Sequence, residues 1–398
     1  MTSCLYVVYD RLIAPDGPGG GSAVHYSRLR SLAELGHDVH LWHYAYPAGR
    51  RAFDAYYDSH REQWNDVQGL CASVELLTYP DRPSLVARTA NRAANSTRRT
   101  WIENPVVRFN VARDYGRVLD RVAPDLVWAE SLGPGQVTTL RQGPPVVYSH
   151  HDWRSRIRAV APGSPDTTAR LRREEERVAR RAAAVVSGSA VESVELQRLG
   201  CANVHYLPMG YSDGAVPSAD RAGDPAIVHL GSMSTTASRV GLATFVDKVV
   251  PSLGAAAELV VIIGDLAGAP DGLASVVRRL RTLGFVDDLT AVLTPYDIHV
   301  IPWDRPTGQR TRAVAAMRHR QVIVAVRAGV ACFPELEDGL NCRIVERVED
   351  MTPVILELLA DAPRRRALGN SAAETYERSF TMNALGSRYA AVIDSVLT

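Results

Sequence analysis

Short apolar runs alternate with helix-length segments along nearly the whole chain, and this rhythm limits the possible folds strongly. The first unit has an apolar run at Leu5 to Tyr9, glycines at 17 to 21, a helical pattern from Ser22 to Leu35 and a second run at Val39 to His43. Alternating strands and helices require parallel strands joined by right-handed crossovers. We therefore expect an α/β protein with Rossmann-like parallel sheets.

A loop-rich segment divides the chain in two. From 208 to 225 the sequence is rich in glycine, proline, serine and aspartate, a composition typical of an interdomain linker. A second series of alternating runs begins at Ala226 and includes an expected helix around Leu273 to Leu283. We predict an N-terminal domain over 1–210, a linker over 211–225 and a C-terminal domain over 226–382.

Composition excludes several classes of protein. The 398 residues carry a formal net charge of +1, so the totals give no sign of a nucleic-acid partner. Five scattered cysteines without a C-x-x-C pair indicate a reduced intracellular protein. No 18-residue apolar stretch or signal-peptide pattern is present. We expect a cytoplasmic protein without an integral membrane segment, whose oligomeric state and peripheral membrane contacts stay open.

Candidate ligand-binding residues follow the apolar runs, because open parallel sheets bind ligands beyond the carboxyl ends of their strands. Gly20 and Gly21 open the first helix, where free amides attract a phosphate or sugar oxygen; a turn without ligand is the alternative. His150, His151 and Asp152 follow a strand. A histidine can hydrogen-bond a sugar hydroxyl, and a carboxylate can fix its tautomer. A polar loop explains this triplet equally well.

The second half offers a hydroxyl-rich turn after its first strand. Gly231 and Ser232 begin this turn, whose amides and hydroxyls suit a diphosphate, and Arg239 could supply the countercharge. A helix cap rich in hydroxyl groups is the alternative.

A second candidate in this half is a helix start that carries positive charge. Gly308 precedes a predicted helix with Arg310 and Arg312 in its first turn. Positive charge is unfavourable at a helix N-terminus unless an anion binds there. We therefore favour a bound anion over a solvated basic face.

Several segments resemble, in order, the donor domain of the family 4 retaining glycosyltransferases. They read GSMSTTASRVGLATFVDKVVPSL, LVVIIGD, LGFVDDLTAVLTPYDIHVIPW, TGQRTRAVAAMRHRQVIVAV and FPELEDGLNCRIV. The N-terminal half agrees more loosely, through GGGSAVHYSRLRSLAELGHDVHLW and EEERVARRAAAVVSGSAVESVELQRLGCANVHYLPMG. The resemblance implies the B-type fold (GT-B), two Rossmann-like domains facing across a cleft, with the last helix, in 383–398, crossing back to the first domain.

The same resemblance implies a nucleotide diphosphate sugar as co-substrate. Arginines and helix amides would neutralise the leaving group, in agreement with the lack of a strand-end Asp-x-Asp metal motif, so we expect no metal and no cofactor. Transfer would retain anomeric configuration by same-face attack, with the leaving phosphate taking the acceptor's proton. The donor-binding residues would be Gly231, Ser232, Arg239, Gly308, Arg310, Arg312 and Glu335. The acceptor-binding residues would be Gly20, Gly21, His150 and Trp153. The catalytic residues would be His151 and Asp152.

One departure from the family pattern leaves other functions open. Where the family usually has a ribose-binding glutamate, this chain has Ala315, a loss that should weaken donor binding by about 1 to 3 kcal/mol. A catalytically silent nucleotide-sugar-binding relative or partner subunit is therefore an alternative. Another is a nucleotide-sugar epimerase or pseudo-glycosyltransferase, for which Glu130, Asp152 and Glu335 are the carboxylates at strand ends.

The acceptor is the least constrained element of the prediction. Trp64, Trp101 and Trp153 could stack on a sugar or ring system, although core packing explains a lone tryptophan equally well. The lack of a strongly basic amphipathic helix argues against a polymer-building enzyme on anionic lipid. We expect a small acceptor such as a secondary-metabolite core or a nucleoside.

Overall fold

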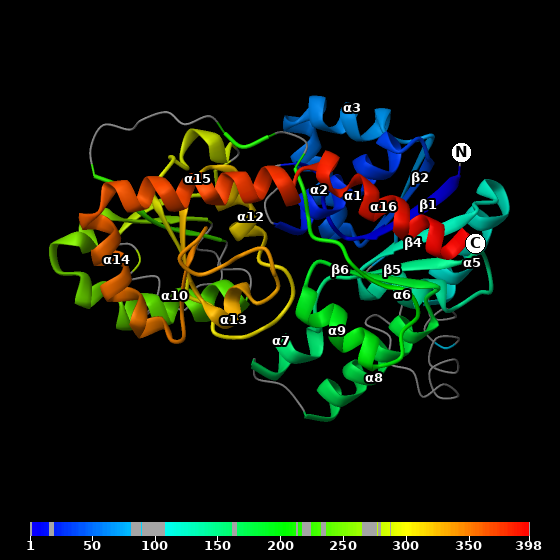
Figure 1. Cartoon of the computed structure of the whole chain (residues 1–398). Coiled ribbons are helices and arrows are strands. Elements are labelled where there is room, and N and C mark those ends of the chain that lie inside the picture. The colour runs from blue at the N-terminus through cyan, green and yellow to red at the C-terminus, as the bar shows by residue number, and fades with distance from the viewer. Residues whose placement is uncertain are drawn as a thin grey trace.

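The computed structural model describes residues 2–15, 20–80, 89, 108–160, 165–211, 214–216, 224–231, 236–264, 277, 280–286 and 288–397. Two lobes lie side by side, each built on one sheet with helices around it (Figure 1). Every strand pairing within both sheets is parallel. The predicted α/β class with two parallel sheets is confirmed.

The N-terminal lobe holds a seven-stranded sheet with the order β3-β2-β1-β4-β5-β6-β7. Its strands are β1 (Ser3–Tyr9), β2 (Asp38–Ala45), β3 (Ser73–Thr78), β4 (Leu126–Glu130), β5 (Val146–His150), β6 (Ala184–Ser187) and β7 (Val204–Tyr206). Its helices are α1 (Gly20–Glu34), α2 (Pro47–Ser59), α3 (Arg61–Gly69), α5 (Arg108–Val122), α6 (Leu132–Thr138), α7 (Arg154–Val160), α8 (Pro165–Arg181) and α9 (Ala190–Arg198). The strand order reverses at β1, the position where sheets of this kind bind ligands.

The C-terminal lobe repeats this plan with the strand order β10-β9-β8-β11-β12-β13. Its strands are β8 (Ile227–Leu230), β9 (Val260–Ile263), β10 (Arg281–Gly284), β11 (Ile298–Ile301), β12 (Val322–Val326) and β13 (Arg343–Val345). Its α-helices are α10 (Thr236–Lys248), α12 (Thr311–Arg318), α13 (Arg327–Val330), α14 (Met351–Ala360) and α15 (Ala362–Ser379). Short 3₁₀ segments are η1 (Val250–Leu259), η2 (Leu289–Ala291) and η3 (Val348–Asp350).

The last helix, α16 (Met382–Leu397), packs on the lobe that begins the chain. Figure 1 shows it running from the end of α15 across the N-terminal lobe. Its side chains Leu385, Tyr389 and Val392 are buried in the same core as Leu126 and Val147 of the first sheet. The two ends of the chain therefore share one hydrophobic core, which ties the lobes together.

The predicted helix around Leu273 to Leu283 is wrong at its C-terminal end. Residues 281–284 form β10 and pair with β9, where the sequence pattern predicted the end of a helix from 273 to 283. Pairing along the sheet edge overrides the local helical preference there. Apart from Val277 and Leu280, the rest of that predicted helix lies outside the described residues.

Within the described part of the chain, no single helix has the length and apolar character to cross a membrane. One adjacent pair, Arg239–Lys248 and Val250–Leu259, meets those criteria only when taken together, and it is bent by 98°. Leu242, Phe245 and Leu253 of this pair are buried in the core of the C-terminal lobe.

Candidate active site

The two lobes touch where several of the predicted site residues lie. A methyl group placed on Gly308, before α12, would lie 2.8 Å from Cβ of Asp152 and 3.1 Å from the carbonyl oxygen of His151, both after β5. A methyl group on Gly20, at the start of α1, would overlap the side chain of Thr311 in α12. The structure thus places Gly308, predicted to bind the donor, against His151 and Asp152, which were predicted to be catalytic.

A buried carboxylate, Glu192 of α9, holds this junction. Its Oε1 accepts a hydrogen bond of 2.9 Å from the backbone amide of Gly308, and its Oε2 lies 3.2 Å from Nε2 of His150. Burial opposes ionisation, but His150 and the Gly308 amide hold the pKa of Glu192 below its ordinary value. An ionised acceptor of the N-terminal lobe therefore fixes the loop that precedes α12 in the C-terminal lobe.

Two arginines follow that loop and carry the positive charge of the site. Arg312 donates to Nε2 of His229, at the end of β8, over 3.1 Å, and the Arg310 guanidinium lies 5.8 Å from the ring centre of Trp303. Burial, and next the charge of Arg310, lower the pKa of Arg312 to about 9. The ligand-free protein thus holds two half-buried positive charges that repel each other, an arrangement that an anion would stabilise.

His151 connects the junction to a second buried carboxylate, Glu130 at the end of β4. Its Nε2 lies 2.6 Å from Oε2 of Glu130, whose side chain has no exposed surface. His25, Glu130 and His151 bring three possible metal-ligand atoms within 4.8 Å of one another. However, an Arg28 guanidinium nitrogen lies 2.9 Å from that Glu130 oxygen and 3.4 Å from His151 Nε2. Because this cation already neutralises the carboxylate, we assign the cluster to a buried ion pair.

Comparison with known proteins identifies the family of this arrangement. The family model described as Glycosyltransferase Family 4 matches residues 18–213, and the model described as Glycosyl transferases group 1 matches residues 224–361. The chain belongs to glycosyltransferase family 4. The two matches leave only the linker and the ends of the chain uncovered, so the assignment applies to both lobes of this glycosyltransferase.

Solved structures of other glycosyltransferases share the fold over the whole chain. A sucrose-phosphate synthase from Thermosynechococcus elongatus is 15% identical, with a TM-score of 0.71 over 99% of this chain and 98% of its own. A glycosyltransferase from Rickettsia africae is 12% identical, with a TM-score of 0.65 over 100% and 99%. Anabaena HepE, solved with UDP and glucose, is 16% identical, with a TM-score of 0.63 over 99% and 100%. No curated protein sequence matches this glycosyltransferase.

Two residues that the sequence assigned to acceptor binding lie in the interior of this glycosyltransferase. Trp153 has no exposed surface; its indole nitrogen donates to Glu195, and the Arg172 guanidinium lies 3.6 Å from its ring centre. His150 is also fully buried, beside Glu192. Both side chains are therefore enclosed by protein in this conformation, His150 beside Glu192 at the junction, and a direct acceptor contact by either residue stays a prediction.

The remaining predicted residues are placed as follows. Glu335 accepts a hydrogen bond of 2.9 Å from Tyr206 of β7 through Oε2, and its Oε1 lies 3.7 Å from Arg388 of α16. Gly231 directly follows β8 and donates its amide to the Ile263 carbonyl, and Ser232 lies outside the described residues. Arg239 is half-buried in α10, and Gly21 is exposed in the first turn of α1. Ala315, at the family's glutamate position, is buried in α12.

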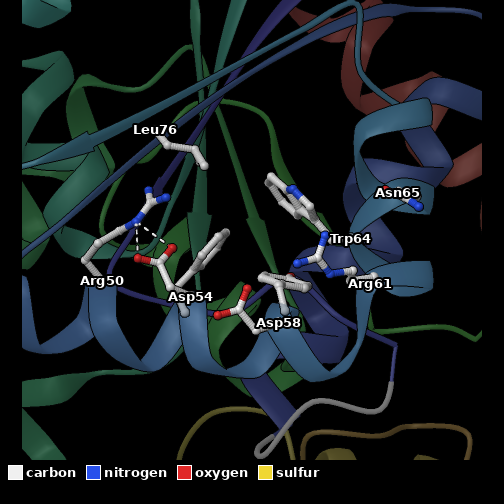
Figure 2. A pocket seen from close by; sticks show the side chains of 9 residues that line it. Arg50, Asp54, Asp58, Arg61, Trp64, Asn65 and Leu76 are labelled. Carbon is white, nitrogen blue, oxygen red and sulfur yellow. Dashed lines mark hydrogen bonds and ion pairs between the residues drawn. The ribbon is translucent and has the colours of Figure 1, made fainter.

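A hollow opens between α2, α3 and β3 in the N-terminal lobe. It encloses about 510 Å³ of empty space, part of it open to solvent. Its lining combines aromatic rings with charged groups: Arg50, Phe53, Asp54, Tyr57, Asp58, Arg61, Trp64, Asn65 and Leu76. Figure 2 shows Arg50 joined to Asp54 on one side and Arg61 beside Trp64 on the other. The Tyr57 hydroxyl also bonds to the backbone of Ile13, so the hollow adjoins the segment that follows β1.

We predict that the Gly308→Ala variant lowers kcat/KM more than tenfold, because the added methyl group would push Asp152 and the two lobes apart. Gly308 also has φ of +56°, where a side chain costs roughly 1–2 kcal/mol. Gly200→Ala is the control, since Gly200 has φ of +76° at the end of α9 and no neighbour within 4 Å of the added carbon. Equal losses of melting temperature and of activity in the two variants would show that only backbone strain matters.

Proposed function

We propose that this glycosyltransferase transfers a sugar from a nucleotide diphosphate donor to a small hydroxylated acceptor, with retention of anomeric configuration. The observation that carries the proposal is the mutually repelling pair Arg310 and Arg312 at the start of α12, directly after Gly308, where the two lobes meet. Arginines and helix amides together are suited to a diphosphate. The division into an acceptor-binding domain over 1–210 and a donor-binding domain over 226–382 is part of the proposal.

The same arginines support metal-independent departure of the nucleotide. Positive charge placed beside the leaving phosphate supplies the electrostatic stabilisation that a divalent cation gives in other enzymes. We expect a chelator such as EDTA to leave the initial rate unchanged. A rate restored only by added Mg²⁺ or Mn²⁺ would contradict this part of the proposal.

The carboxylates near the junction support retention over alternatives that need a free acid and base. Glu130 is fully buried in an ion pair with Arg28, and Glu192 accepts the Gly308 amide. Burial, and next the Glu192 charge, raise the pKa of Asp152, so this carboxyl group is a poor candidate for a nucleophile. Same-face attack, in which the leaving phosphate accepts the proton of the acceptor hydroxyl, needs none of these three carboxylates. NMR of the product's anomeric proton tests it, because an α-linked donor should give an α-linked product.

We propose that the part of the acceptor that does not react occupies the hollow between α2 and α3. Trp64 offers a partly exposed ring face, and carboxylate, amide and guanidinium groups surround it, a combination suited to a polyhydroxylated ring. We place the reaction in the cytoplasm, in biosynthesis of a small glycoside, in line with five free cysteines.

We predict that the Asp58→Asn variant raises KM for the acceptor about five- to tenfold, the loss expected for one charge-assisted hydrogen bond. Asp58 lines the hollow and is exposed, so the fold should be unaffected. Initial rates at saturating donor measure the effect on acceptors found by mass spectrometry of product mixtures. Glu62→Gln is the control, because Glu62 is exposed on the neighbouring helix and does not line the hollow. The same KM for both variants would place the acceptor elsewhere.

The experiment that tests the function itself is a thermal-shift series with nucleoside diphosphates and their sugar conjugates. UDP and UDP-glucose come first, since HepE was solved with UDP-glucose. Stabilisation by one nucleotide series, lost in Arg310→Ala, supports the donor site and names the base. A silent relative is favoured by one observation, the buried Ala315. It would bind the conjugate without transferring or hydrolysing the sugar.

A further inference from the structure

The Glu130 carboxylate is surrounded by hydrogen-bond donors from several elements. Its Oε1 accepts from the Tyr6 hydroxyl at 2.9 Å and the Trp128 indole nitrogen at 2.7 Å. Its Oε2 accepts from Arg28 at 2.9 Å and from Ser149 at 2.8 Å. Four donors on two oxygens, one of them a permanently charged guanidinium, favour the ionised carboxylate. Burial opposes this charge, but Arg28, then His151 and His25, hold the pKa of Glu130 well below its ordinary value.

An ionised carboxylate determines where the proton of His151 resides. Nε2 of His151 lies 2.6 Å from Glu130 Oε2, and two acceptors cannot share that distance without a proton between them. Nε2 therefore carries the hydrogen and donates it. Burial lowers the pKa of His151 to about 4 although Glu130 opposes the shift, so the imidazole is neutral near pH 7. In a neutral imidazole with Nε2–H, the other nitrogen, Nδ1, is a hydrogen-bond acceptor.

The charged and titratable groups around His151 come from four elements. They are Tyr6 on β1, His25 and Arg28 on α1, Glu130 on β4 and Tyr389 on α16, which interacts with Arg28. Most of them are fully buried, whereas the His151 side chain keeps 23% of its surface exposed. The network therefore reaches the surface of the lobe junction through the His151 ring.

We propose that Glu130 is a positioning residue that holds His151 in the Nε2–H form, so that Nδ1 accepts a hydrogen bond from a hydroxyl group of the bound sugar. This inference rests on the proposed function, because it assumes that a sugar lies at the lobe junction. A phosphate oxygen has no proton to donate to Nδ1 when fully ionised, so His151 favours a hydroxyl group. Arg310 and Arg312 then hold the diphosphate, and His151 orients the sugar.

Nitrogen-15 NMR of histidine-labelled protein tests the tautomer without any substrate. We expect the His151 signals, assigned by their loss in His151→Asn, to show a proton on Nε2, strongly deshielded by its short bond to a carboxylate. In Glu130→Gln this proton should shift upfield or exchange with water. A proton on Nδ1 in the wild type, or an unchanged signal in Glu130→Gln, would overturn the proposal. The wild-type spectrum decides the tautomer even if Glu130→Gln does not fold.

Binding measurements then separate this inference from the proposed function. Glu130→Gln should bind UDP as the wild type does, because the arginines are intact, but should lose about ten- to hundredfold in kcat with the sugar conjugate. His151→Asn, whose amide oxygen can replace Nδ1 as an acceptor, should keep more activity than His151→Ala. If the wild type binds neither UDP nor any other nucleotide sugar, the proposed function fails. If it transfers sugar and Glu130→Gln does so equally well, only the role of Glu130 fails.

Discussion

Replacing Arg310 or Arg312 with glutamine is expected to lower kcat/KM for the nucleotide sugar about 10²- to 10³-fold, the range found when one charge-stabilising donor is removed from an active site. Both side chains are half-buried, so water screens their attraction for the diphosphate less than it would at an exposed site. The double variant should lose less than the product of the two single losses, because both arginines stabilise the same diphosphate. Initial rates over a range of donor concentrations measure the effect.

The same substitutions should leave the ligand-free protein as stable as the wild type, or more stable. Arg310 and Arg312 repel each other, and burial penalises the charge of Arg312. Removing one of the two charges therefore removes the repulsion that the remaining arginine experiences. Thermal unfolding without ligand measures this. Arg327→Gln is the matched control, since Arg327 is an exposed arginine of α13 that pairs with Glu346 and lies on the solvent side. A loss of activity that accompanies a lower melting temperature would indicate a structural role for these arginines.

Much of the fold could be predicted because its strands are buried on both faces. The run from Leu126 to Glu130 is fully buried, and parallel strands covered by helices on both sides appear in a sequence as short continuous apolar runs. The β10 strand, Arg281–Gly284, lacks that signal, because it is an edge strand with an exposed arginine and no fully buried residue. Its pairing with β9 is a tertiary contact that local sequence does not encode.

The candidate site could be predicted only where it follows strand ends. That rule selected His151 and Asp152, which the structure places against Gly308 across the junction. The same rule selected Trp153. The sequence does not show that Glu195 accepts the indole N–H or that the Arg172 guanidinium lies over the ring. Glu192 was missed for the complementary reason: it lies inside a helix, and its partner Gly308 is 116 positions away.

Truncating Glu130 to alanine is expected to reduce the free energy of unfolding of the N-terminal lobe by about 3–5 kcal/mol, because the Arg28 guanidinium would remain buried without its partner. The Tyr6 hydroxyl and the Trp128 indole would also lose their acceptor. Urea unfolding followed by tryptophan fluorescence measures the loss. The double variant Arg28→Met, Glu130→Leu should recover part of it, because a buried ion pair can be replaced by apolar side chains of similar volume.

Glu34→Ala provides the control, since Glu34 pairs with Arg30 at the surface of α1 and should contribute less than about 1 kcal/mol. The dependence on pH tests the ionic origin of the larger effect. A carboxyl group whose pKa is lowered by folding stabilises the protein above its unfolded pKa of about 4.3, and this contribution declines as the pH falls toward the folded value. The difference between wild type and Glu130→Ala should therefore be constant from pH 8 to about pH 5 and shrink below about pH 4. A difference that stays constant down to pH 3 would mean that lost packing, not the charge of Glu130, sets the stability of this core.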